Sequence, residues 1–343
     1  MSVLLSQVLL AGPVLTGLLS ADGDLAEVAS MNGRQLIGIP MALVGAVLLS
    51  FGAQYQSRGL NKVERIVGQS AGSGLSLRHI LSMLRRPSWV IGTLLLGLAV
   101  VFQIGSLSFA PLIVVQPIGV VALVVTAVLN SRMSGVRLGR RAQLSVALAV
   151  GGIVAFVTIA AFSAADRPVT DAKLITILIA FGVVFLLALV LFVLFRHRGV
   201  ALIYIVGSGV LYGFVATFAK SVIGRLQQGE FEWLTWACVL ALVLGALLGM
   251  VFVQNAYSSG PPDLVVAGLT VIDPIVAVLI GIVVLGEAAS ASGLAIAAFV
   301  VSGAVAVVGV LGLAKHHPQV GKSHLPAVTG RVPVPEERAG EDG

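Results

Sequence analysis

The chain contains nine apolar runs, each long enough or nearly long enough to cross a lipid bilayer as a helix, which takes about 20 residues. Lipid offers no hydrogen bonds to a backbone, so each run must form a helix or belong to a closed barrel. The run LLALVLFVLF at 186–195 does not alternate apolar and polar residues as a barrel strand does, and helices are therefore predicted. The predicted spans are 36–53, 88–105, 110–129, 142–164, 174–195, 200–222, 234–253, 264–286 and 291–313.

The composition excludes a water-soluble domain. Hydrophobic residues make up 58% of the chain and charged residues 10%, whereas a soluble domain carries roughly 25% charged residues. The predicted fold class is therefore an all-α integral membrane protein. The net charge of +6 does not indicate nucleic-acid binding, because the basic residues lie in short loops between apolar runs. The single cysteine, Cys238, excludes a disulfide or a thiolate metal cluster within one chain.

The distribution of Lys and Arg predicts the orientation in the membrane, because cytoplasmic loops carry an excess of basic residues. Sixteen basic residues fall on one side of the predicted spans, in 54–87, 130–141, 196–199 and 315–343, and five fall on the other side. The side with sixteen is predicted to be cytoplasmic. This places the C-terminus inside the cell and makes the protein a multi-pass protein of the cell membrane. The five residues on the opposite side are Arg34, Arg167, Lys173, Lys220 and Arg225.

Three segments outside the nine runs carry further predictions. The apolar stretch 3–20 has three open interpretations: a tenth transmembrane helix, a cleaved segment, or a disordered or untranslated stretch before a start at Met31. The segment 74–87 is predicted to be an amphipathic helix on the cytoplasmic membrane surface, with an ordinary basic loop as the alternative. The segment 315–343 is rich in Pro, Gly and charge and is predicted to be a disordered tail.

A phrase with proline inside apolar sequence occurs twice, as SFAPLIVVQPIG at 108–119 and as SGPPDLVVAGLT at 259–270, 151 positions later. The match continues without a gap over 103–160 and aligns Pro111 with Pro262. The first four runs therefore correspond to the last four, and the fifth run between them inverts the second copy. We predict two inverted-topology repeats, an architecture that places the substrate between the halves, near the membrane midplane, at broken helices.

The repeat predicts how the chain is organised. An N-terminal segment with the optional tenth helix precedes a first repeat of four helices, a linking helix, a second repeat of four helices and the cytoplasmic tail. The predicted boundaries are 1–35, 36–165, 166–199, 200–314 and 315–343.

Two segments resemble known transporter families. SLSFAPLIVVQPIGVVALVVTAVL at 106–129 resembles the third helix of NIPA-type magnesium transporters. AYSSGPPDLVVAGLTVIDPIVAVLIGIVVLGE at 256–287 resembles the matching segment of EamA-type transporters, including its closing LGE. Both families belong to the drug/metabolite transporter superfamily, and the resemblance covers about 36–313. It implies an inverted-repeat carrier or channel of nine or ten helices and leaves the substrate open. The first copy departs from the pattern, with SGVRLG at 134–139 where a GE pair would be expected.

Polar and charged side chains at membrane depth are costly and commonly mark transport pathways. Asp273 is the one carboxylate deep inside a predicted span. It is predicted to bind a cation, a metal ion or a coupling proton, with a structural cap or pair as the alternative. Pro117 and Pro274 are predicted helix kinks beside a shared cavity. The predicted substrate- or ion-binding set is Asp273, Gln116, Tyr212, Gln254 and Gln103, and the alternative for its uncharged members is hydrogen bonding between helices.

Two charged residues near helix ends have simpler predicted roles. Lys220 is expected to extend its ammonium group to the membrane interface, or to pair with Asp273 or a substrate anion. Glu287 is expected to lie at a solvated helix end.

The leading functional interpretation is a secondary transporter of a small organic solute that works by alternating access, with proton coupling as an option. The alternative is a NIPA-like magnesium transporter, although one deep carboxylate is a small supply of the ligands that Mg²⁺ prefers. A third is a non-transporting scaffold of the cell envelope. No hydrolytic or group-transfer motif occurs, so neither enzymatic activity nor a cofactor is expected. The expected partners are a small solute or cation and membrane lipids, not nucleic acid, and a homodimer is left open.

Overall fold

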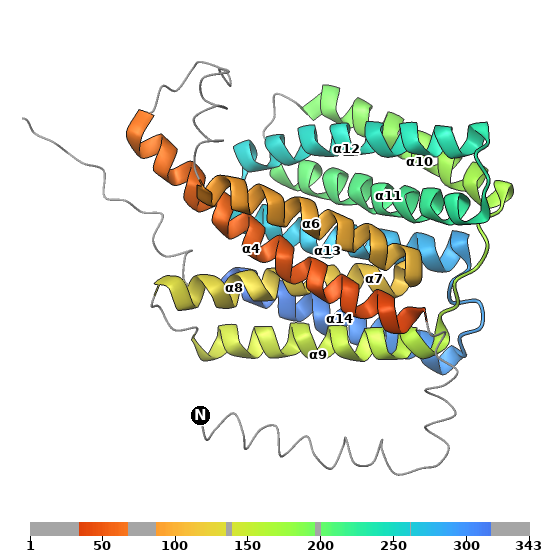
Figure 1. The fold of residues 1–343 in the computed structure, drawn as a ribbon, viewed down its shortest axis with the longest axis horizontal. Helices are drawn as coiled ribbons and strands as arrows, with labels where there is room; N and C mark the ends of the chain where they lie inside the picture. Colours follow the sequence, from red (N-terminus) through yellow and green to blue (C-terminus); the bar gives the residue numbers. More distant parts are fainter. Residues whose placement is uncertain (1–33, 68–86, 135–138, 196–199, 261, 317–343) are drawn as a thin grey trace, which may run out of the picture.

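The computed structural model describes residues 34–67, 87–134, 139–195, 200–260 and 262–316 (Figure 1). The helices lie side by side, most of them along the long axis of the molecule. They are α4 (Gln35–Val67), α6 (Pro87–Phe109), α7 (Leu112–Gly119), α8 (Val121–Ser134), α9 (Arg140–Ser163), α10 (Asp171–Phe195), α11 (Ala201–Gln228), α12 (Trp233–Ser259), α13 (Pro262–Ile280), the π-helical turn η1 (Gly281–Leu285) and α14 (Gly293–His316).

The described part of the chain is all-helical and has nine stretches long and apolar enough to cross a membrane. This confirms the prediction of an all-α membrane-spanning protein. The predicted third span is two helices, α7 and α8, that meet at Val120, and the predicted eighth span is α13 followed by η1. Pro117 lies inside α7 and Pro274 inside α13, so both predicted kink residues are within helices.

Several predicted segments lie partly or wholly outside the described residues. These are the stretch 3–20, most of the predicted interfacial helix at 74–87, and the tail from 317 onward. Helix α14 continues to His316, past the predicted start of the tail at Lys315.

Aromatic side chains fix α10 against α11 and α12. The ring of Phe181 packs against Phe214 and Phe218, with the second pair edge-to-face at 5.2 Å between centroids. The ring of Phe192 packs edge-to-face against Tyr204 and in a tilted arrangement against Phe252. The linking helix therefore packs on the part of the chain that follows it.

Small residues bring α9 and α14 into close contact. A Cβ atom added at Gly152 of α9 would lie 2.5 Å from the backbone nitrogen of Ala306 and 2.8 Å from the carbonyl oxygen of Ser302. The neighbouring Gly151 has no atom within 4 Å of the same added position. Gly152 is thus required by backbone-to-backbone packing between the two helices.

We expect Gly152→Ala to destabilise the protein by about 1–3 kcal/mol, because the added methyl group meets backbone rather than a flexible side chain. Gly151→Ala is the matched control and should leave the free energy of unfolding unchanged or slightly higher. Unfolding in mixed micelles measures both variants. Equal effects of the two substitutions would contradict the close α9–α14 packing.

Candidate functional site

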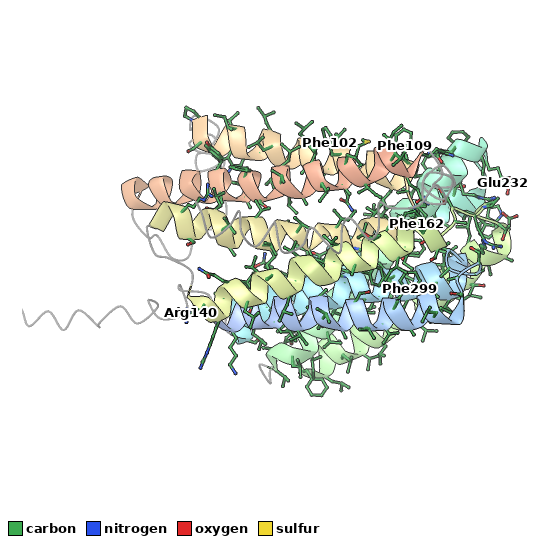
Figure 2. All side chains as sticks on the ribbon, turned by 90° about the horizontal axis from the view of Figure 1, so that it is seen from below. Phe102, Phe109, Arg140, Phe162, Glu232 and Phe299 are labelled. Carbon is green, nitrogen blue, oxygen red and sulfur yellow. The ribbon has the colours of Figure 1, made fainter. Side chains whose placement is uncertain are left out.

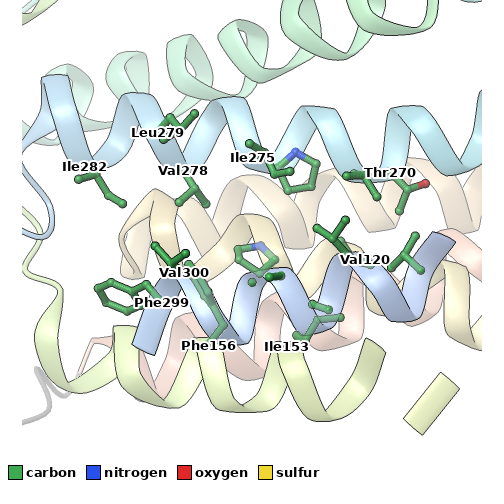
Figure 3. Close-up of a pocket in the computed structure, with 18 residues that line it drawn as sticks. Val120, Ile153, Phe156, Thr270, Ile275, Val278, Leu279, Ile282, Phe299 and Val300 are labelled. Carbon is green, nitrogen blue, oxygen red and sulfur yellow. The ribbon is translucent and has the colours of Figure 1, made fainter. Parts of the chain in front are cut away.

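An apolar groove of about 350 Å³ lies between α7–α8, α9, α13 and α14 (Figure 3). Both predicted kink residues, Pro117 and Pro274, line this groove. Other lining residues include Val120, Ile153, Phe156, Thr270, Val278 and Phe299.

The walls of the groove offer almost no polar group. Thr270 carries the one side-chain hydroxyl among the lining residues, and it donates to the carbonyl oxygen of Val266 at 2.7 Å. Ile275, Leu279 and Val300 line the groove and are also exposed on the outer surface of the bundle. The groove therefore opens sideways onto a surface that faces lipid in a membrane, and its own chemistry suits an apolar group.

Asp273 precedes the groove-lining Pro274 within α13. Its Oδ1 atom is buried and has no hydrogen-bond partner within the described part of the chain. Helix α11 passes close to this turn, since a Cβ added at Gly209 would lie 2.7 Å from the side chain of Ile272 and 3.5 Å from the backbone nitrogen of Asp273. The Oδ1 atom is therefore a buried polar atom without a partner among the described residues, although the side chain as a whole is only half-buried.

The other predicted site residues are dispersed. Gln116 is buried in α7, Gln103 is half-buried in α6, and neither lines the groove. Tyr212 of α11 lies within electrostatic range of Asp273. Its ring packs against Gly249 of α12, where an added Cβ atom would lie 3.2 Å from the ring. Gln254 is exposed on the outside of α12 and lines no part of the groove. Tyr212 is the member of the predicted set that interacts electrostatically with Asp273.

A second polar centre surrounds the proline of the first repeated phrase. Pro111 has no backbone N–H and lies between the end of α6 and the start of α7, where it is the N-cap. We term Leu107–Ile113 the α6–α7 break. Four of its residues, Leu107, Ala110, Leu112 and Ile113, are no more than 2% exposed. Backbone groups this deeply buried require partners within the protein.

Lys220 of α11 satisfies the carbonyl side of the α6–α7 break. Its buried Nζ donates to the carbonyl oxygens of Leu107 at 2.8 Å and Ala110 at 3.0 Å, and to Oδ2 of Asp166 at 3.0 Å. The carbonyls at a helix C-terminus carry partial negative charge, so a cation is favourable there. Gln227 of the same helix donates to the carbonyl oxygen of Ser108 at 2.9 Å.

Glu287 satisfies the amide side of the α6–α7 break. Its Oε1 accepts from the backbone N–H of Leu112 and its Oε2 from that of Ile113, both at 2.8 Å. The next two amides of α7 donate to the carbonyl oxygen of Pro111. All four amides of the first turn are therefore bonded, and the carboxylate lies at the positive end of the helix dipole.

The closing LGE of the second repeat positions this carboxylate. Gly286 adopts the left-handed conformation, with φ of 73°, which reverses the chain after η1. The backbone N–H of Glu287 then donates to the carbonyl oxygen of Gly281 at 3.0 Å. Gly281 also leaves room for the carboxylate, since a Cβ there would lie 2.9 Å from Oε2 of Glu287.

Two sequence-based expectations were wrong at this centre. Glu287 is 2% exposed, not at a solvated helix end, because the turn at Gly286 directs it into the bundle. Lys220 is 3% exposed and pairs with Asp166 and backbone carbonyls, not with Asp273 or the membrane interface. Asp166 was not predicted as a functional residue. Its place directly between two apolar runs was the available signal.

Basic residues gather at this end of the bundle. Besides Lys220, Arg34 donates to the carbonyl oxygen of Ser108, and Lys173 donates to that of Pro168. Arg225 pairs with Asp171 and Glu230, and more distantly with Glu232. Figure 2 places Glu232 at this end and Arg140 at the opposite end. These basic residues are among the five that the sequence assigned to the non-cytoplasmic side, and they lie together at one end of the bundle.

Burial raises the pKa of Glu287 above its ordinary value, and the N–H groups of Ile113 and Leu112 and the ammonium group of Lys220 offset part of that rise. A raised pKa means that the folded protein binds this proton more tightly than the unfolded chain does. The free energy of unfolding therefore falls as the pH rises from about 4.5 through the folded pKa of Glu287.

We expect the wild-type protein to lose stability relative to Glu287→Gln over that pH range, because the amide cannot titrate. Unfolding measurements in micelles at stepped pH give the difference between the two proteins. Gln254→Ala, which changes an exposed side chain that carries no titratable group, should show no such trend against the wild type. A difference between wild type and Glu287→Gln that does not change with pH would refute the prediction.

The chain is similar to an uncharacterized protein of Corynebacterium glutamicum, with 30% identity over 261 residues, which cover 74% of this chain and 86% of that protein. No family model matches the chain. No solved structure matches it either.

Proposed function

The chain belongs to the family of this uncharacterized corynebacterial protein, and we propose that it is a multi-pass membrane transporter of the drug/metabolite transporter superfamily. In this proposal it moves a small organic solute by alternating access, and Asp273 binds the coupling proton or a cation. Its setting is the cell membrane, with the C-terminus in the cytoplasm.

The observation that carries the proposal is the unpartnered carboxylate oxygen of Asp273. It lies inside the membrane-spanning stretch Leu264–Leu285, at a depth where an unpaired polar group is expensive. Its neighbour Pro274 lines the apolar groove. A site that combines one titratable oxygen with an apolar wall suits a solute with an apolar part, bound together with a proton or carrying a positive charge.

The packing of the helices supports the inverted-repeat part of the proposal. Helix α4 packs against α6 as α11 packs against α12, and α4 packs against α7–α8 as α11 packs against α13. Between the halves, α9 packs on its counterpart α14, and α7 packs on its counterpart α13. Helices that pair with their own repeat partners are what a pseudo-two-fold axis in the membrane plane produces.

Magnesium transport is the second candidate, and it rests on the resemblance of 106–129 to NIPA-type transporters. The described residues contain no group of three or more His, Cys, Asp or Glu side chains that could hold a metal ion. Mg²⁺ retains several waters and needs few protein ligands, so Asp273 alone would have to provide the charge. A non-transporting scaffold would leave both the groove and the unpaired oxygen without a role.

The proposed topology is tested by cysteine labelling in a Cys238→Ala background. We expect a cysteine at Asp171 to react with an impermeant reagent from outside the cell, and a cysteine at Lys315 to react only from the cytoplasm. The reason is the excess of basic residues on the side of Lys315. Labelling of position 171 from the cytoplasm alone would show that the orientation is opposite to the proposed one.

We expect Asp273→Asn to leave a folded protein whose solute flux falls to background, because the amide keeps the shape of the side chain but cannot exchange a proton. Asp273→Glu should retain partial flux. A growth screen of a deletion strain across metals, amino acids and toxic analogues identifies the solute, and flux is then measured in proteoliposomes with and without a pH gradient.

The matched control is Gln254→Ala, which alters a predicted site residue that faces outward on α12. It should transport normally per folded molecule. Undiminished flux in Asp273→Asn would remove Asp273 from the site. Magnesium uptake that depends on Asp273 and survives collapse of the pH gradient would replace the organic solute by Mg²⁺.

A further inference from the structure

The α6–α7 break belongs to the first half of the chain, but side chains of the second half hold it. Lys220 bonds to carbonyl groups 113 and 110 residues earlier in the chain, and Glu287 bonds to amides 175 and 174 residues earlier. Each of these side chains is at least 97% buried, since their exposed fractions are 3% and 2%. The two halves are therefore joined by contacts in the protein interior and not by contacts at its surface.

The charges at this centre are complementary on both sides of the break. An ammonium group meets the carbonyl end of α6, and a carboxylate meets the amide end of α7. Asp166, Arg167 and Lys173 are further charged groups close to this pair, and Arg34 donates to the carbonyl oxygen of Ser108 within the break. Asp166 bonds directly to Lys220, so the positive charge of Lys220 has a negative charge beside it.

We propose that Lys220 and Glu287 form a latch that closes this end of the bundle between the two halves, and that the latch opens once in each transport cycle. This proposal rests on the proposed transport function. In this proposal the first repeated proline segment, 108–119, is part of a gate, because the break leaves free of helix hydrogen bonds the backbone groups that the latch binds.

Opening has a specific physical requirement. When the halves separate, two amides and two carbonyls of the break lose their partners, and buried groups without partners are costly. Water must therefore enter the break as the latch opens. Ala110, which is 0% exposed in the latched state, should then become accessible to a water-soluble reagent.

The test measures the reaction of a cysteine at position 110 with a water-soluble maleimide, in a Cys238→Ala background. The protein is placed in nanodiscs, which expose both membrane faces, so the result does not depend on topology. We expect slow labelling with the latch intact and several-fold faster labelling in Glu287→Gln and in Lys220→Met. Glu232→Gln is the control for charge removal at this end and should label as slowly as the parent. Equal rates in all four proteins overturn the latch.

A second measurement uses the unaltered chain, in case the latch variants do not fold. The repeat pairs Ile113 with Leu264, which is 47% exposed near the start of α13. We expect hydrogen–deuterium exchange to be much slower for the amides of Leu112 and Ile113 than for Leu264. Exchange of both helix starts at the same rate would overturn the latch without any substitution at its residues.

Labelling measured in the presence of a transported solute distinguishes failure of the latch from failure of the transport proposal. Adding a transported solute to the Ala110→Cys protein should accelerate labelling, because cycling opens the latch. Solute flux without any change in labelling overturns the latch and leaves transport standing. Faster labelling in the two latch variants, in a protein that moves no solute, supports the latch as a closure and counts against the transport function.

Discussion

The pairing of two opposite charges with the end of α6 and the start of α7 is the interaction on which this structure depends. Pro111 interrupts an apolar segment and leaves carbonyl groups on one side and amides on the other. Both sets are buried inside the protein, so this connection between two spans is stable only if other helices supply the partners. Lys220 and Glu287 supply them, and in doing so they join the second half to the first.

The membrane-spanning helices could be predicted from sequence because hydropathy is a local property of each run. The break could be predicted in part, since proline inside apolar sequence is a local signal as well. The partners of the break could not, because Lys220 and Glu287 lie more than a hundred residues away and only the packed bundle brings them there. The outward position of Gln254 could not be predicted for a related reason: α12 is apolar on all sides, so its sequence does not reveal which face is inside.

The candidate site shows the same limits. Asp273 was predicted from its depth, and its Oδ1 atom is buried without a partner among the described residues. The groove beside it was predicted only as a cavity between prolines, and its sideways opening depends on how α13 and α14 diverge (Figure 3). The structure thus has a polar centre at one end of the bundle and a separate apolar groove, whereas the sequence suggested a single cavity.

The glutamate of the second repeat has no counterpart in the first. Position 287 corresponds to Val136 at the offset of 151 residues, so the repeat does not supply a second carboxylate for the opposite end. A carrier built from two similar halves would then have unlike closures, one ionic and one without this charge. Such a carrier has no reason to spend equal time open to each side. Its resting bias, and how salt shifts that bias, would be set by a single unmatched residue.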